Sequence, residues 1–178
     1  MFNNELKKKQ EQLMELVGKR FIPKKDGENA VEFVYYSGVA EFQCRIEIDL
    51  NSKAIFLSAV LTTPIMEDYQ MTALEWCNMI NDKLSIGHFS IDPETGYVKW
   101  SSGTYFWKTE LTERIMRTLL ESSILNIDHY SLSLLHVSIG DAENDYASAI
   151  ELIGVSQGIA VSESCHYTYE KHPSIERN

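Results

Sequence analysis

Residues 72–100 read TALEWCNMINDKLSIGHFSIDPETGYVKW, and this stretch decides the fold because its hydrophobic period changes part-way along. In the first half, apolar residues recur with the 3.6-residue period of a helix. In the second half, apolar residues alternate with a period of two, which is typical of a β-hairpin. The helical set is Ala73, Trp76, Cys77, Ile80 and Leu84, and the hairpin set is Phe89, Ile91, Val98 and Trp100. Neither half can bury its apolar side alone, so we expect both to close on one core, with Trp76 and Trp100 inside it.

The two ends of this stretch carry turn and cap signals. Pro93 presets φ in the hairpin turn, and Gly96 can take the positive φ that a loop of this kind often needs. The helix is predicted to begin between Glu67 and Thr72. Thr72 with Glu75 fits a capping box, in which each side chain bonds an unpaired backbone N–H group at the helix start, and a start near Glu67 is equally compatible.

Three strand-like runs precede the helix, at residues 31–38, 41–49 and 54–61. Strict alternation in EFQCRIEID, residues 41–49, indicates one packed and one solvated face, as in antiparallel sheets. The mixed apolar faces of residues 54–61 predict a more central strand, and short connections favour sequential antiparallel pairing. Pro23 and residues 24–29 are predicted to form a loop.

Helical patterns flank this sheet on both sides. Residues 5–17 are predicted to be helical and to stop at Gly18. Residues 111–140 predict a long helix capped by Thr109 or Thr112, which would reach about 42 Å and would either bend near Asp128 or extend past the sheet. The expected architecture is an α+β two-layer sandwich, an antiparallel five-stranded sheet with helices packed on it in the order α-β-β-β-α-β-β-α.

The remaining chain, residues 141–178, is expected to be a short acidic helix, DAENDYASAIELIG, followed by an irregular tail. We expect it to pack on, or extend from, a domain formed by residues 1–140. A chain of 178 residues with 44% hydrophobic residues suits one globular domain.

The charge balance bears on the classes of partner. Sixteen basic against 26 acidic side chains give a formal charge of −10, which opposes binding to nucleic acid and to anionic membranes. The lysines at 7–9 are expected to form a solvated helix face. No run of about 20 apolar residues and no secretory signal is recognised, and three scattered cysteines predict no disulfide framework, so we expect a cytoplasmic protein.

The string INDKLSIGHFSIDPETGYVKW, followed by LTERIMRTLLESSILNIDHY, resembles the bacterial YbjN-like domain. The matching residues are Asn78, Asn81, Gly87, Phe89, Asp92, Pro93, Glu94, Thr95, Gly96 and Val98, with Trp100 as a hairpin aromatic and Asp128 with Tyr130 as an acidic–aromatic pair. The resemblance covers roughly residues 5–140. It implies a fold like that of type III secretion chaperones, often dimeric, and protein binding without catalysis.

The polar members of this pattern have structural explanations. We expect Asn78 and Asn81 to cap the helix or bridge to the hairpin, because buried amides require partners. Turn formation explains Asp92, and solvent exposure explains Glu94. Asp128 and Tyr130 are expected to make a structural hydrogen bond, with a binding role as the alternative.

No catalytic or metal-binding group is expected. A pair of Cys77 and His88 fails because a thiol on an apolar stripe has a raised pKa and is inert. Cys165, His166 and His172 match no zinc spacing, and His129 and His136 lie two helical turns apart, too far to chelate together. We therefore expect no enzyme, no cofactor and no metal.

Three consecutive aromatics, Tyr105, Phe106 and Trp107, cannot all point to the same side of an extended chain. At least one must leave the core face, which makes these residues the candidate partner-binding surface. The sequence thus predicts a cytoplasmic protein-binding module, chaperone- or regulator-like and homodimeric, which takes an extended or helical segment of a partner. The alternative is a small-ligand sensor with a pocket between the helix of Trp76 and the sheet.

Overall fold

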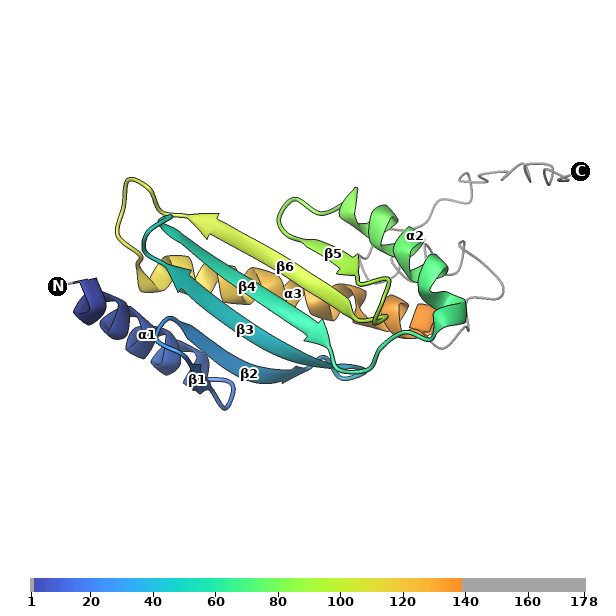
Figure 1. The fold of residues 1–178 in the computed structure, drawn as a ribbon, viewed down its shortest axis with the longest axis horizontal. Helices are drawn as coiled ribbons and strands as arrows, with labels where there is room; N and C mark the ends of the chain where they lie inside the picture. Colours follow the sequence, from blue (N-terminus) through green and yellow to red (C-terminus); the bar gives the residue numbers. More distant parts are fainter. Residues whose placement is uncertain (1, 139–178) are drawn as a thin grey trace, which may run out of the picture.

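The computed structural model describes residues 2–138, and these form one sheet with helices packed against it (Figure 1). In chain order the elements are α1 (Phe2–Gly18), β1 (Lys24–Asp26), β2 (Ala30–Tyr36), β3 (Glu41–Asp49), β4 (Ala54–Leu61), the 3-10 helix η1 (Glu67–Tyr69), α2 (Gln70–Asn81), β5 (His88–Ile91), β6 (Val98–Tyr105) and α3 (Glu113–Ser138). The predicted α+β sandwich with an antiparallel sheet is confirmed. The expectations for residues 141–178 lie outside the described residues.

The sheet has six strands in the order β1-β2-β3-β4-β6-β5, and every neighbouring pair is antiparallel. The prediction of five strands was one short, because β1 lies in the segment expected to be a loop. Its three residues pair with β2, with Lys24 opposite Glu32 and Asp26 opposite Ala30. A strand of three residues is too short for its alternation to be detected in the sequence. The tight turn at residues 27–29 brings it beside β2.

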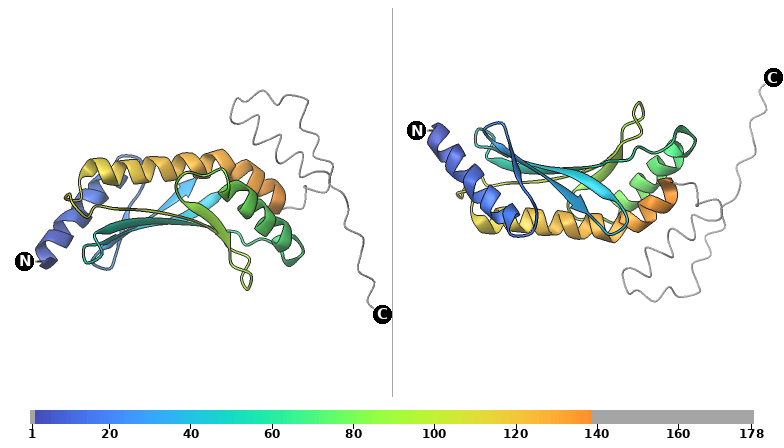
Figure 2. Two further views of the ribbon diagram at one scale, coloured as in Figure 1. Left: turned by 90° about the horizontal axis from the view of Figure 1, so that it is seen from above. Right: turned by 90° about the horizontal axis from the view of Figure 1, so that it is seen from below.

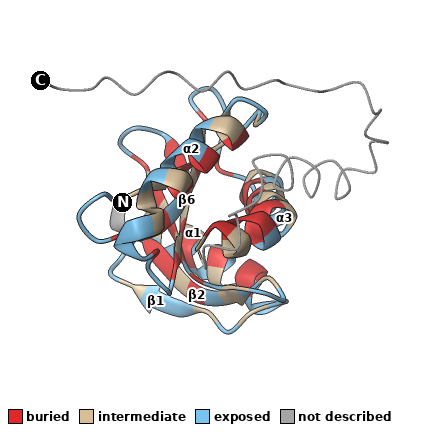
Figure 3. Cartoon of the chain, turned by 90° about the vertical axis from the view of Figure 1, so that its right-hand side faces the viewer, coloured by how far each residue is buried: buried red, intermediate tan, exposed pale blue. Residues whose placement is uncertain are grey.

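The helices cover one face of this sheet. Figure 2 shows α3 running along the sheet with α1 beside its N-terminal part, and α2 lies at the β5 end of the same layer. The predicted alternation of β3 is confirmed, since Phe42, Cys44, Ile46 and Ile48 are buried toward the helices. Figure 3 shows the buried residues lining the space between sheet and helices.

The junction of α2, the β5–β6 hairpin and α3 is a cluster of four aromatic rings. Trp76 of α2 lies 5.1 Å from Phe89 of β5 between ring centroids, and Phe89 lies 4.9 Å from Trp100 and 6.1 Å from Tyr130. Each of the four side chains is at most 3% exposed. Burying an aromatic ring of this size contributes about 2–3 kcal/mol, and edge contacts add about 1 kcal/mol. The expected shared interior, with Trp76 and Trp100 inside, is confirmed.

The start of α2 differs from one prediction. The helix begins at Gln70, after η1, so Thr72 lies within its first turn and is not the N-cap. The N-cap residue is Tyr69, and its side chain makes no capping hydrogen bond. The turn of η1 leads directly into α2, which removes the need for the capping box.

The long helix α3 lies close to β6 because small residues face each other there. The hydroxyl oxygens of Ser102 and Ser123 are 2.7 Å apart, and both side chains are buried. At the start of α3, the Thr112 hydroxyl oxygen accepts a hydrogen bond from the Ile115 N–H group at 3.3 Å. Of the two predicted capping residues, Thr109 and Thr112, it is therefore Thr112 that caps the helix. Within the described part of the chain, no helix is long and apolar enough to cross a bilayer.

Candidate protein-binding surface

The face of the sheet opposite the helices is covered by no other described element (Figure 2). We call it the uncovered face. Register and alternation place on it one residue in two from each of the four central strands. These include the exposed side chains Val34, Tyr36, Gln43, Phe56, Lys99 and Tyr105.

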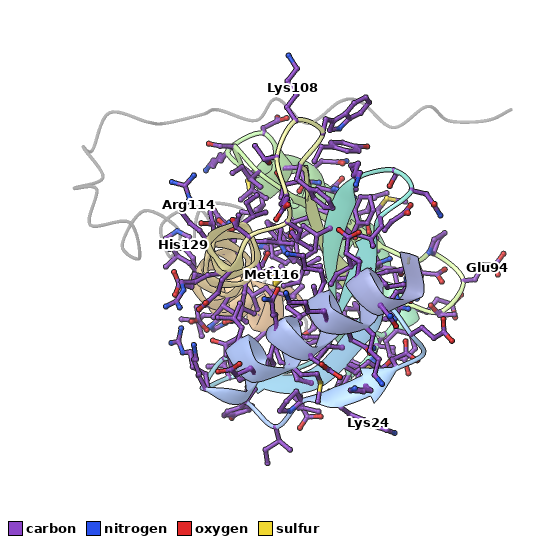
Figure 4. All side chains as sticks on the ribbon, turned by 90° about the vertical axis from the view of Figure 1, so that its left-hand side faces the viewer. Lys24, Glu94, Lys108, Arg114, Met116 and His129 are labelled. Carbon is purple, nitrogen blue, oxygen red and sulfur yellow. The ribbon has the colours of Figure 1, made fainter. Side chains whose placement is uncertain are left out.

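Two of the three predicted aromatics lie on the surface at one end of this face. Tyr105 is 60% and Trp107 is 72% exposed, and their ring centroids are 5.5 Å apart in an edge contact. Lys108, the next residue, points away from the body of the molecule (Figure 4). The pair therefore stands at the start of an exposed loop between β6 and α3.

Phe106 does not share this surface. It is 3% exposed and belongs to the core, so the candidate surface loses one of its three predicted members. Its N–H group donates to the Lys53 carbonyl oxygen at 2.8 Å, and its own carbonyl accepts from the Thr109 N–H group at 3.2 Å. The alternation that buries Phe106 turns its two neighbours outward.

Phe56 joins Tyr105 and Trp107, and sequence reasoning missed it. It is 42% exposed and pairs with Gly103, two residues before Tyr105 on the same face of β6. A Cβ atom at Gly103 would lie 2.6 Å from the Phe56 ring, so the ring lies over the glycine. The signal in the sequence is an aromatic residue paired with a glycine on the neighbouring strand. It can be recognised only when the register of the two strands is known. We call Phe56, Tyr105 and Trp107 the aromatic patch.

Beside the patch, the uncovered face holds an open pocket of about 430 Å³. Its polar lining includes Arg45, Glu47, Ser58, Lys99 and Ser101. The Arg45 Nε atom lies 2.7 Å from an Asp26 carboxylate oxygen, and the Arg45 guanidinium also pairs with Glu47. Hydrogen bonds to these carboxylates raise the pKa of Arg45, so the guanidinium stays charged. The Glu47 carboxylate of the pocket lining is therefore already paired with Arg45.

Asn81 bridges α2 to the hairpin, as expected. Its amide nitrogen donates to the Phe89 carbonyl oxygen, its amide oxygen accepts from the Phe89 N–H group, and both distances are 2.8 Å. Asn78, one turn earlier, is exposed, and its backbone carbonyl accepts from the Asp82 N–H group at 3.2 Å. Of the two asparagines, Asn81 thus holds the edge of β5.

Glycines and a turn aspartate fix the hairpin. Gly87 has φ +76°, and a Cβ atom there would lie 2.4 Å from the Trp100 ring. Gly96 has the predicted positive φ, +73°, and its carbonyl accepts from the Ile65 N–H group at 2.9 Å. The Asp92 carboxylate accepts from the Glu94 N–H group at 2.9 Å, and these turn bonds lower the pKa of Asp92.

The tip of the same hairpin is solvated. Pro93 and Glu94 are exposed in the turn, and Glu94 points away from the molecule (Figure 4). The solvent-exposure explanation for Glu94 is confirmed.

Asp128 and Tyr130 have separate structural roles. The Asp128 carboxylate accepts a hydrogen bond from the Tyr35 hydroxyl, which ties α3 to β2. Burial, followed by this bond, raises the pKa of Tyr35. Tyr130 is buried in the aromatic cluster. The structural bond expected for this pair is thus formed by Asp128, with Tyr35 as its partner.

The thiols of the described residues are not activated. Cys77 is 1% exposed, and burial raises its pKa to about 12, whereas His88 is exposed on β5. Burial likewise raises the pKa of Cys44 to about 12. Residues 2–138 hold no cluster of three or more potential metal ligands, and Cys165, His166 and His172 lie outside them.

The space between α2 and the sheet, where a sensor pocket was considered, is occupied by side chains. Trp76 and Ile80 of α2 and Trp100 of β6 are each at most 1% exposed. The indole nitrogen of Trp76 donates to the Ser133 hydroxyl oxygen at 3.0 Å. This interior is a packed core.

The chain is similar to known proteins in its fold, and not in its sequence. No protein-family model and no curated protein matches the sequence. The structure is similar to that of YbjN, a proposed transcription regulator from E. coli, with a TM-score of 0.52 and 10% sequence identity over 76% of this chain and 90% of that one. This likeness confirms the expected YbjN-like fold.

Two protein complexes have lower TM-scores against this structure. The HopA1–SchA chaperone–effector complex has a TM-score of 0.42 and 13% identity, over 65% of this chain and 89% of that one. The ExsC–ExsE complex also has a TM-score of 0.42, with 18% identity over 66% of this chain and 90% of that one.

Proposed function

We propose that the chain is a non-enzymatic protein-binding module, chaperone- or regulator-like, that takes a segment of a partner protein on its uncovered face, beginning at the aromatic patch. The observation that carries this proposal is the position of the patch. Tyr105 and Trp107, 60% and 72% exposed, stand at the end of a sheet face that no described helix covers.

The chemistry of the patch supports binding to a protein. Exposed Trp and Tyr residues supply large contact areas, and they are the residue types enriched among those that dominate interface energies. An extended segment would meet alternate side chains of β4 and β6, and a helical segment would lay its apolar stripe on the same rings. The fold shared with YbjN, itself described as a proposed regulator, agrees with a role without catalysis.

A second copy of the chain is one partner of the required kind. A homodimer formed through the aromatic patch would bury the three exposed rings of each protomer, and we include it in the proposal. We also propose a cytoplasmic location, in which Cys44 and Cys77 remain reduced thiols.

A capture experiment tests the proposal. Partners are captured from a bacterial lysate by the wild-type protein, by the double variant Tyr105→Ser/Trp107→Ser and by the control Met71→Ser. Met71 is 67% exposed and lies on α2, far along the molecule from the patch (Figure 1). We expect the double variant to lose at least tenfold of a captured partner, and the control to retain it.

Equal capture by all three proteins would contradict the proposal, as would the absence of any captured protein together with a monomeric mass at every concentration in light scattering. A metabolite that raises the melting temperature of the wild type and of the double variant alike would instead favour the sensor alternative.

A further inference from the structure

The outer side of α3 carries a stripe of alternating leucine and histidine residues near its C-terminal end. Leu125, His129, Leu132 and His136 follow one another at i, i+4, i+7 and i+11, so they lie along one line of the helix. Leu125 is 69% exposed and Leu132 is 41% exposed. Figure 4 shows His129 on the side of α3 that faces away from the sheet, so this stripe belongs to neither the core nor the uncovered face.

The chain that follows α3 has a matching pattern. Among residues 141–154, Tyr146, Ile150 and Ile153 recur at i, i+4 and i+7. The segment lies outside the described residues, and only Ile139 and Gly140 separate it from the end of α3 at Ser138. A connection of two to five residues between two helices is typical of an antiparallel helical hairpin.

We propose that residues 141–154 form a helix that folds back on α3 and covers Leu125 and Leu132. The lengths of the two segments and their positions relative to the connection support this segment as the one that covers the stripe. Counted from the connection, Leu132 is six residues before Ser138 and Tyr146 is five residues after Asp141. By the same count Leu125 and Ile153 lie thirteen and twelve residues away, so both helices rise about 18–20 Å to bring these two residues together.

The composition of the segment agrees with this arrangement. A helix of fourteen residues is marginal alone in water, so it needs an apolar face on which to pack. Asp141 and Glu143 stand in the first turn, where the helix dipole favours negative charge. The aromatic patch would remain open to a partner, because it lies at the opposite end of the molecule from the end of α3 (Figure 1).

Cysteine pairing tests the register. In the full chain carrying Cys165→Ser, we introduce Leu125→Cys with Ile153→Cys, and as the control Thr118→Cys with Ile153→Cys. Thr118 is also exposed and lies on the same line of α3, about 10 Å farther along. Disulfides require Cα atoms within about 7 Å. We expect the first pair to form an intramolecular disulfide under mild oxidation and the control pair to form at least tenfold less.

Equal cross-linking of both pairs, or of neither, would overturn the proposal. A disulfide found between two chains in place of one within the chain would overturn it as well, because a second copy would then be the occupant of the stripe.

Hydrogen exchange of the full chain gives an independent measurement. We expect amides 145–153 to exchange at least tenfold more slowly than the unprotected rate, and to lose this protection in the variant Leu125→Glu/Leu132→Glu. The control Ile22→Glu changes a side chain that is 92% exposed near β1, and it should leave the protection unchanged. Amides of β3 and β4 report that each variant is folded. The absence of protection in the wild type, or its persistence in the double variant, would overturn the proposal.

Discussion

Single side chains at the β5 edge decide how the hairpin is held against α2. The amide of Asn81 satisfies both backbone groups of Phe89, in the way that a neighbouring strand would. Trp100 fills the space above Gly87, where no Cβ atom fits. These contacts make the hairpin part of the domain although it is the last strand pair of the sheet.

The first prediction concerns the Asn81 amide. Asn81→Ala leaves the N–H and C=O groups of Phe89 without their protein partner, and it should lower the free energy of unfolding by about 1–3 kcal/mol. Urea denaturation measures the change. Asn78→Ala, three residues away and exposed, should change it by less than about 0.5 kcal/mol. Similar losses in the two variants would show that the bridge contributes nothing particular.

A second prediction concerns Gly87. Gly87→Ala adds a Cβ atom 2.4 Å from the Trp100 ring at a backbone φ of +76°, so it should cost about 2–5 kcal/mol in urea denaturation. Gly27→Ala is the matched control, because Gly27 also has a positive φ, +58°, and no atom lies within 4 Å of its added Cβ. It should cost only about 1–2 kcal/mol. A loss at Gly87 no greater than at Gly27 would contradict the steric explanation.

The third prediction follows from the raised pKa of Tyr35. The unfolded chain releases the proton of this residue near pH 10, whereas the folded protein retains it because of burial and the bond to Asp128. The stabilisation is therefore fully present below about pH 10 and is lost as the pH rises above that value. Denaturation between pH 8 and pH 11 should show a steeper loss for the wild type than for Tyr35→Phe. Tyr36→Phe, on the exposed neighbour, should retain the wild-type slope, and identical slopes for all three proteins would refute the assignment.

At the scale of the elements, the contact between α3 and β6 sets how closely the helix layer approaches the sheet. Ser102 and Ser123 meet there with buried hydroxyl groups 2.7 Å apart. Small residues at a contact of this kind allow the two backbones to come close, and the shared hydrogen bond satisfies both hydroxyls.

The fourth prediction enlarges that contact. Ser123→Leu forces a larger side chain between α3 and β6 and leaves the Ser102 hydroxyl unpaired, so it should cost about 2–4 kcal/mol. For a domain of this size, that corresponds to a fall in melting temperature of about 5–15 °C, measured by circular dichroism. Ser122→Leu places the same side chain one residue away at a half-buried position and should change the melting temperature by about 2 °C or less. Equal falls would mean that helix propensity, and not this contact, is responsible.

The elements differ in how far the sequence could predict them. The alternation of β3 and the period of α2 are long enough to identify both, because one face of each is buried along its whole length. β1 has only three residues, so no pattern could identify it. The burial of Phe106 between two exposed aromatic residues depends on where β6 ends and on the backbone bond to Lys53. The place of Phe56 in the aromatic patch depends on its pairing with Gly103. These contacts connect distant parts of the chain, so local periodicity does not contain them.

At the scale of the whole molecule, the three tryptophans report on different regions. Trp76 and Trp100 are at most 1% exposed in the aromatic cluster, whereas Trp107 is 72% exposed in the aromatic patch. One measurement of fluorescence can therefore separate the interior from the proposed binding surface.

The fifth prediction uses this difference. Iodide should quench only part of the tryptophan emission of the wild type, and Trp107→Phe should abolish that part and shift the remaining emission to shorter wavelength. If the protein forms a homodimer through the patch, the quenchable part of the wild-type emission should decrease as protein concentration rises. Quenching that persists in Trp107→Phe would contradict the burial of the other two indoles.

The burial of Phe106 between two exposed rings has a consequence for recognition. Phe106, between Tyr105 and Trp107, is buried in the core, and its N–H group is hydrogen-bonded to the Lys53 carbonyl oxygen. The backbone that carries the two exposed rings is therefore already fixed in the free protein. Little conformational freedom is then lost on contact, and affinity does not have to offset that cost. A substitution that loosens the packing of Phe106 should therefore lower the affinity for a partner, although Tyr105 and Trp107 are both retained.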